Sequence, residues 1–361
     1  MAADTCSCVR EEDARWMQRA LDNARRGLGT TSPNPPVGAV IVREGHLLGE
    51  GWHEKAGEPH AERRALADAR ARGNGEALRG ATIYVTLEPC SSYGRTPPCT
   101  EAILEAGLAR VVYGAVDPDE RHRGRADALL RAAGVEVCPG VLREACEAFL
   151  RPWMHAVRTG RPWVVAKVAT TLDGRLTRRS TRWISGPEAL REGHELRLHS
   201  DAILVGGQTV RHDDPALTIR TPISPVPAIK QQPWRVVVTQ HREQLPASAQ
   251  LFTDAWADRT VVLEQVTDWE QVLRDLYRER GVVQLMLECG GRLLRPLLEA
   301  RLVDAWMQVV APVLSGGDEE VIPGAFLPAE VRLELTRREP CGRDLLLEGY
   351  LTYESPRHED L

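Results

Sequence analysis

The sequence predicts an α/β protein of two domains, residues 1–150 and 151–361. Apolar runs typical of strands alternate with amphipathic segments typical of helices along both halves, as in α/β layer folds. The length of 361 residues also corresponds to two domains of ~150 residues each. The pattern lapses between Phe149 and Pro162, and it differs between the halves, so we expect two distinct domains rather than a duplication.

The first half is expected to open with a helix from Glu11, because apolar residues recur three and four positions apart and glycines follow. The proline-rich stretch 31–36 predicts a loop. Apolar runs and alanine-rich segments predict the remaining elements. Strands are expected at 37–42, 82–87, 110–116 and 135–138, a hairpin partner at 45–51, and helices at 60–72, 99–106 and 126–133.

The second half is expected to open with a strand at 163–169 and a turn at Leu172-Asp-Gly. The proline-rich segment 221–233 predicts a loop. The same criteria predict the other elements. Strands are expected at 202–205, 235–239, 260–263, 283–287, 304–312 and 345–353, and helices at 187–199, 268–280 and 291–299.

The composition argues against two classes of partner. Lys plus Arg number 46 and Asp plus Glu 51, a formal net charge of −5, whereas nucleic-acid binders carry a basic face. No apolar run reaches the ~18 residues that a membrane-spanning helix needs. Residues 1–13 lack the basic start and apolar stretch of a signal peptide, so we expect a cytoplasmic protein with neither a nucleic-acid nor a membrane partner.

Four residues of the first half predict a catalytic zinc site. His60 begins a predicted helix, Cys90 follows a predicted strand, and Cys99 begins another helix. One imidazole and two thiolates are three zinc ligands, and catalytic zinc sites leave a fourth position for water. Glu62 lies two residues after His60, where it can move protons without binding the metal.

These residues form a motif, His-x-Glu followed by Pro-Cys and a second Cys, that resembles the signature of zinc nucleoside and nucleobase deaminases. The cysteines are separated by an eight-residue insert, which resembles the pyrimidine deaminase domain of bifunctional riboflavin-biosynthesis enzymes. Further blocks share this resemblance: Thr31-Ser-Pro-Asn-Pro-Pro-Val-Gly38, Gly57-Glu-Pro-His-Ala-Glu62, Tyr84-Val-Thr-Leu-Glu-Pro-Cys90 and Asp117-Pro118.

The second half has no Gly-x-Gly-x-x-Gly that opens a βαβ unit, so a Rossmann site is not indicated. Its blocks resemble instead the reductase domain of the same bifunctional enzymes, which has a dihydrofolate-reductase-like α/β fold and uses NADPH. These blocks are Lys167-Val-Ala-Thr-Thr-Leu-Asp-Gly-Arg175, Trp183-Ile-Ser, Asp201-Ala-Ile-Leu-Val-Gly-Gly-Gln-Thr-Val210, Asp213-Asp-Pro-Ala-Leu-Thr-Ile-Arg220 and Leu287-Glu-Cys-Gly-Gly291.

The resemblance implies a cytidine-deaminase-like α/β/α domain followed by the reductase domain. Together they would deaminate 2,5-diamino-6-(5-phosphoribosylamino)pyrimidin-4-one and then reduce its ribosyl group to ribityl. It also implies a homodimer or higher homo-oligomer. In the deaminase, Glu62 would shuttle protons, Asn34 would hold the pyrimidine and Arg95 would lie near the phosphate. In the reductase, Ala169, Trp183, Thr209 and Asp213 would contact NADPH. Thr181, Arg197, Leu217, Arg220 and Glu288 would contact the sugar phosphate of the substrate, with Arg197 and Arg220 as candidate anchors of the phosphate.

One further cofactor site follows from the residues themselves. Gly290 and Gly291 stand between a predicted strand and a predicted helix, where glycines let backbone amides approach a cofactor phosphate.

The chain departs from the family pattern at Ser92, Gln208, Cys289 and Val313, where histidine, a different turn residue, glycine and lysine are usual. Two alternatives therefore remain. One is a nucleic-acid deaminase that flips a base into the zinc pocket, which the acidic charge and the second domain disfavour. The other is a deaminase whose reductase-like domain has lost activity and serves binding or assembly.

Overall fold

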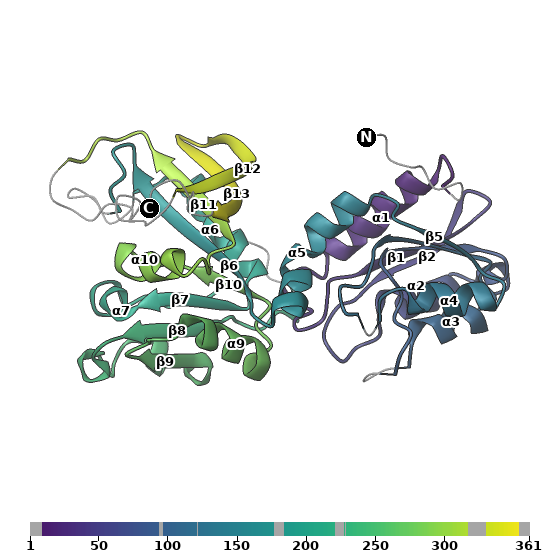
Figure 1. Cartoon of the computed structure of the whole chain (residues 1–361), viewed down its shortest axis with the longest axis horizontal. Helices are drawn as coiled ribbons and strands as arrows, with labels where there is room; N and C mark the ends of the chain where they lie inside the picture. The colour runs from purple at the N-terminus through teal and green to yellow at the C-terminus, as the bar shows by residue number, and fades with distance from the viewer. Residues whose placement is uncertain are drawn as a thin grey trace, which may run out of the picture. The chain divides into compact units, whose positions relative to one another are not determined.

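The computed structural model describes residues 9–93, 97–120, 122–176, 184–220, 227, 229–316 and 330–353. The chain forms two compact units, Met1–Gly160 and Arg161–Leu361 (Figure 1). The first unit closes with helix α5 (Arg143–Thr159), so the division lies at Gly160 rather than at residue 150. The sequence pattern predicted an interruption that includes Pro152. Helix α5 nevertheless continues through this proline, because Cys146, Leu150 and Met154 bury one face of the helix.

The first unit is a five-stranded sheet between two layers of helices (Figure 1). The strand order is β2-β1-β3-β4-β5, with β1 antiparallel to β2 and β3 and the others parallel. Helices α1 and α5 contact one side of the sheet, and α2, α3 and α4 pack together on the other. The elements are α1 (Asp13–Arg25), β1 (Gly38–Arg43), β2 (His46–Trp52), α2 (Ala61–Ala71), η1 (Glu76–Leu78), β3 (Thr82–Leu87), α3 (Cys99–Glu105), β4 (Arg110–Ala115), α4 (Arg125–Ala132) and β5 (Glu136–Pro139).

Close packing holds α1 against this sheet. A Cβ atom on Gly38 would lie 2.0 Å from the carbonyl oxygen of Ala20, so only glycine permits this approach. Beneath α1, Arg110 donates two hydrogen bonds of 2.7 and 2.8 Å to Asp13. The Tyr84 hydroxyl donates a third to Asp13, at 2.9 Å, which completes a buried polar link between α1, β3 and β4.

The second unit is built on an eight-stranded sheet of order β12-β13-β11-β6-β10-β7-β8-β9. The run from β11 to β9 is parallel, and β13 pairs antiparallel with β11 and with β12. The elements are β6 (Trp163–Thr171), α6 (Pro187–His199), β7 (Ala202–Gly206), α7 (Gly207–Asp213), β8 (Trp234–Thr239), η2 (Arg242–Gln244), α8 (Gln250–Thr253), η3 (Ala257–Arg259), β9 (Thr260–Glu264), α9 (Trp269–Arg280), β10 (Gln284–Leu287), α10 (Gly291–Glu299), β11 (Ala305–Ala311), β12 (Val331–Cys341) and β13 (Asp344–Tyr353).

The strands and helices expected from the sequence are confirmed to within a few residues at their ends. The sequence missed α5, α7, α8 and β12, and the short 3-10 helices η1, η2 and η3. Strand β12 is an edge strand whose side chains are mostly exposed, so it lacks the apolar alternation of a half-buried strand. Residues 221–226 and 228 of the expected loop lie outside the described part of the chain. None of the described helices has the length and apolar composition needed to cross a membrane.

Candidate active sites

Three side chains of the first unit converge on one point. His60 caps the start of α2, Cys90 follows β3, and Cys99 is the first residue of α3. The Nδ1 atom of His60 lies 3.5 Å from the Cys90 sulfur and 3.4 Å from the Cys99 sulfur. Tetrahedral zinc with ordinary Zn–N and Zn–S bonds requires a nitrogen–sulfur separation of about 3.5 Å, so these ligands fit the metal.

The surroundings of Cys90 favour the thiolate form that binds zinc, whereas a hydrogen bond with Cys90, and then burial, raise the pKa of Cys99. Hydrogen bonds from Cys99, and then from His60, hold the pKa of the Cys90 thiol well below its usual range. The Cys99 backbone N–H, at the start of α3, donates to the Cys90 sulfur at 3.2 Å. A helix N-terminus carries partial positive charge, which stabilises a thiolate at this position.

Glu62 lies beside these ligands, in the first turn of α2. Its side chain is only 3% exposed, and burial raises its pKa. Glu62, His60 and Cys90 line a cavity of about 420 Å³, which can hold a pyrimidine nucleotide. Asn34 lines the same cavity, so the structure brings together the predicted proton shuttle, two zinc ligands and the predicted ring-binding residue.

His53 fixes the orientation of Asn34, a role that the sequence did not reveal. The His53 Nδ1–H donates to the Pro59 carbonyl at 3.2 Å, and the Asn34 amide donates to His53 Nε2 at 3.1 Å. Burial lowers the pKa of His53 to about 4, so its ring is neutral at pH 7 and Nε2 can accept. The Asn34 side-chain oxygen therefore remains available to a ligand.

Another wall of the cavity comes from the chain after β4. Glu88 accepts hydrogen bonds from the backbone N–H groups of Asp117, at 3.3 Å, and Gly124, at 3.2 Å. Ser92 contacts His122 across this wall, with 3.1 Å between Oγ and Nδ1. The imidazole of His122 therefore lies next to residue 92, the position at which the family usually has histidine.

In the second unit, the carboxyl ends of neighbouring parallel strands form the candidate site. Glu288 follows β10, Gly207 follows β7, and Ala169 lies near the end of β6. Strands β6 and β7 both pair in parallel with β10, so these residues share one edge of the sheet. Open α/β sheets bind ligands at this edge.

Glu288 forms a partly buried ion pair with Arg197 of α6. The Arg197 Nε and one terminal nitrogen donate to Glu288 at 3.1 and 2.6 Å, and the other terminal nitrogen donates to the Thr218 carbonyl at 3.0 Å. Burial opposes ionisation of Glu288, but the charges of Arg197 and Lys167 outweigh it and lower its pKa. Burial also lowers the pKa of Lys167, on β6.

Glycines shape the places where a phosphate-bearing cofactor would bind. A Cβ atom on Gly207 would lie 2.8 Å from the Thr239 hydroxyl, and one on Gly206 would lie 3.2 Å from Leu293. Gly290 precedes α10, whose first backbone N–H groups have no partner within the helix. Gly206 and Gly207 are therefore needed for close packing at this edge, and the start of α10 presents backbone N–H groups there.

Comparison with known proteins identifies both units. Residues 10–115 match the cytidine and deoxycytidylate deaminase zinc-binding region, and residues 162–347 match the RibD C-terminal domain. The riboflavin biosynthesis protein RibD of Aquifex aeolicus is 36% identical over 361 residues, which cover 94% of this chain and 98% of that protein. The chain belongs to the RibD family. The RibD of Escherichia coli is 38% identical over 336 residues, which cover 85% of this chain and 89% of that protein.

Solved RibD structures share the fold of the whole chain. Acinetobacter baumannii RibD is 34% identical, with a TM-score of 0.86 over 95% of this chain and 99% of its own. The Thermotoga maritima diaminohydroxyphosphoribosylaminopyrimidine deaminase/5-amino-6-(5-phosphoribosylamino)uracil reductase is 31% identical, with a TM-score of 0.83 over 94% of this chain and 99% of its own. The predicted succession of a deaminase-like and a reductase-like domain is therefore confirmed.

The other residues predicted from the RibD resemblance lie in several elements of the second unit. Thr209 and Asp213 are on α7, and Leu217 and Arg220 are on the irregular segment that follows it. Three predicted residues lie outside the described part of the chain: Arg95, Thr181 and Trp183.

Proposed function

We propose that this RibD-family chain catalyses two successive steps on one phosphorylated pyrimidine. The first is hydrolytic deamination of 2,5-diamino-6-(5-phosphoribosylamino)pyrimidin-4-one, and the second is NADPH-dependent reduction of its ribosyl group to ribityl. The observation that supports this most strongly is the convergence of His60, Cys90 and Cys99 beside Glu62 in one cavity. The reductase-like unit on the same chain supports the second step.

In the deaminase, His60, Cys90 and Cys99 would hold zinc, which lowers the pKa of water and so supplies a nucleophile at neutral pH. Water adds to the ring carbon that bears the amine, the carbon–nitrogen bond breaks, and ammonia leaves. Glu62 accepts a proton from the water and returns it to the departing nitrogen, which its raised pKa favours. Asn34, held by His53, orients the ring.

In the reductase, hydride transfer is the chemistry of NADPH, and the protein positions the reactants. Hydride adds to the sugar carbon bonded to nitrogen, the bond from that carbon to the ring oxygen breaks, and the oxygen takes up a proton. Lys167 can supply this proton, whereas Glu288, whose pKa is lowered, stays ionised and holds Arg197 in place. Ala169, Thr209, Asp213 and the backbone at Gly290 would contact the cofactor.

The test uses the full chain, purified without chelator. Metal analysis should find about one zinc per chain, and the diamino substrate should release ammonia and then oxidise an equal amount of NADPH. Zinc and ammonia release without NADPH oxidation would mean that the reductase step is lost. The whole proposal would be refuted if the chain, at high substrate concentration, released no ammonia and oxidised no NADPH.

We also propose that the chain acts in the cytoplasm as a homo-oligomer. Both steps use phosphorylated small molecules and NADPH, which cells hold inside the cytoplasm. Analytical ultracentrifugation of the purified chain should give a mass of at least twice 40.0 kDa, and a monomer at micromolar concentration would contradict the assembly.

A further inference from the structure

The residues after α7 form an irregular segment whose shape the surrounding protein imposes. Within residues 214–219, Asp214 has φ of 42° and Leu217 has φ of 50°. Left-handed backbone is unfavourable for a residue with a side chain, so this segment would not adopt the shape unaided. Leu217 and Ile219 are buried, which fixes the faces of the segment but leaves its backbone polar groups to be satisfied.

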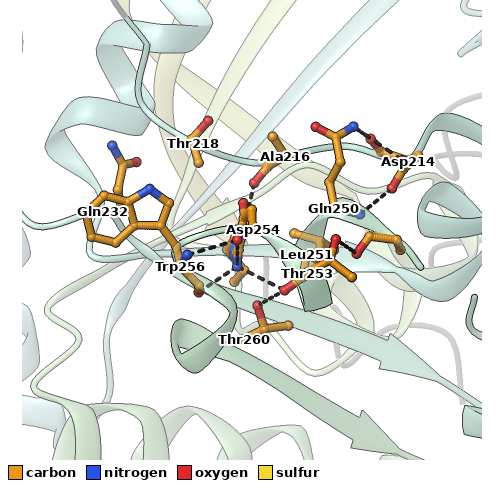
Figure 2. A network of polar contacts seen from close by, with 12 residues as sticks. Asp214, Ala216, Thr218, Gln232, Gln250, Leu251, Thr253, Asp254, Trp256 and Thr260 are labelled. Carbon is orange, nitrogen blue, oxygen red and sulfur yellow. Dashed lines mark hydrogen bonds and ion pairs between the residues drawn. The ribbon is translucent and has the colours of Figure 1, made fainter. Parts of the chain in front are cut away.

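Side chains from other elements satisfy these groups in place of a neighbouring strand. Gln250 donates to the Asp214 carbonyl at 2.6 Å, and Arg235 donates to the Ala216 carbonyl at 3.1 Å (Figure 2). Asp254 in turn binds two nitrogens of Arg235, at 2.7 and 2.9 Å. The backbone is therefore held at a series of points before it reaches Arg220.

The contact nearest Arg220 is made by Gln232. The Ile219 N–H donates to the Gln232 side-chain oxygen at 2.7 Å, and the Gln232 amide donates to the Ile219 carbonyl at 3.2 Å. This paired contact fixes the peptide groups on both sides of Ile219, and Arg220 follows directly. A carboxylate could accept the first bond but could not donate the second, so the contact requires an amide.

The two arginines predicted to hold the substrate phosphate are in different situations. Arg197 is 8% exposed, and all three of its side-chain nitrogens donate to Glu288 or to Thr218. Arg220 is exposed, and no ion pair engages it among the described residues. Burial, and then the charges of Arg197 and Arg220, lower the pKa of His194 to about 4, so both guanidinium groups lie close enough to act on His194.

We propose that Gln232 is a positioning residue for the reductase step, which sets affinity for the substrate phosphate by holding the backbone that presents Arg220. The proposal rests on the proposed function, because it assumes a phosphorylated substrate. Gln232 itself does not touch the substrate. A cation fixed in advance binds phosphate more tightly than one that must be ordered on binding, so the contact acts on affinity for the phosphorylated form.

The test compares the deaminated intermediate with its dephosphorylated form as substrates of the full chain. For Gln232→Ala, kcat/KM for the phosphorylated substrate should fall about tenfold, mainly through KM, as expected for two lost neutral hydrogen bonds. The value for the dephosphorylated substrate should stay within twofold. Gln232→Glu should show the same selective loss, and the exposed neighbour variant Gln231→Ala should match the wild type.

Outcomes that overturn the proposal are distinct from those that overturn the proposed function. If kcat/KM fell equally for both substrates, Gln232 would be merely structural. If kcat/KM stayed at the wild-type value for both substrates, Gln232 would have no role in the reductase step. NADPH binding, measured by fluorescence titration, reports whether each variant has folded. If Gln232→Ala does not bind NADPH, the ratio measured for Gln232→Glu decides. A wild-type chain that reduces neither substrate would refute the proposed function instead.

Discussion

Replacing Glu62 by glutamine separates proton transfer from metal binding. The amide has nearly the same shape as the carboxylate but cannot carry a proton between water and the leaving nitrogen. Because Glu62 is 3% exposed, bulk water has little access to take its place. General acid–base catalysis contributes roughly 10²–10⁴-fold, or about 3–5 kcal/mol of barrier, and we expect deamination to fall by that factor.

The assay measures ammonia release, zinc content and NADPH oxidation on the same preparation. Zinc should stay at the wild-type ratio because His60, Cys90 and Cys99 are unchanged, and the reductase step should be unaffected because it lies in the other compact unit. Glu58→Gln is the matched control, since Glu58 also lines the cavity but is exposed. A Glu62→Gln enzyme with full activity, or an equal loss in the control, would refute the reasoning.

Metal removal and three substitutions test the zinc site and two ion-pair networks of the first unit. Chelation should abolish ammonia release and leave NADPH oxidation on the deaminated intermediate intact, with zinc restoring the first activity; parallel loss of both would contradict separate units. Asp13→Asn should lower the free energy of unfolding by about 3–5 kcal/mol, because it removes one partner of a buried ion pair. Urea unfolding, monitored by the loss of deaminase activity, measures this change. Glu136→Gln, at the exposed end of the same network, should cost less than about 1 kcal/mol. Hydrogen bonds from Arg19 lower the pKa of Glu50 from 4.5 to about 2. The ionised Glu50 carboxylate therefore stabilises the folded state fully above pH 4.5, and this stabilisation is lost as the pH falls towards 2. At ~1.4 kcal/mol per pH unit this contribution is about 3 kcal/mol, and Glu50→Gln should flatten acid unfolding over that range.

The zinc site could be predicted from the sequence because its chemistry depends on residue type and local context. His60 and Cys99 are at helix starts and Cys90 follows a strand, all of which periodicity can locate. The neighbouring His53 could not be found this way. Its function depends on a contact with Asn34, 19 residues away, and on burial, neither of which has a local signal.

Helix α5 shows a different limit of the sequence pattern. Proline inside a helix removes one backbone hydrogen bond, so the sequence between Phe149 and Pro162, which contains Pro152, predicts an interruption. Packing of Leu150 and Met154 outweighs that loss in the folded unit. The boundary was consequently placed inside an element, although two domains and their order were predicted correctly.

The arginines illustrate why the second site was harder to predict than the first. Arg110 and Arg235 are each 2% exposed or less, and their guanidinium groups serve carboxylates and carbonyls of the fold. The Arg197 guanidinium is likewise bound to a carboxylate of the fold, that of Glu288. In the sequence, however, Arg197 cannot be distinguished from Arg220 as a phosphate ligand. A guanidinium whose N–H groups already donate to the protein can bind a phosphate only by breaking those bonds. Arg220 is exposed and forms no ion pair with the described residues, so it would exchange only water for the phosphate. Affinity for the phosphate should therefore depend chiefly on the backbone that positions Arg220, which is the part of the site that residue type alone cannot specify.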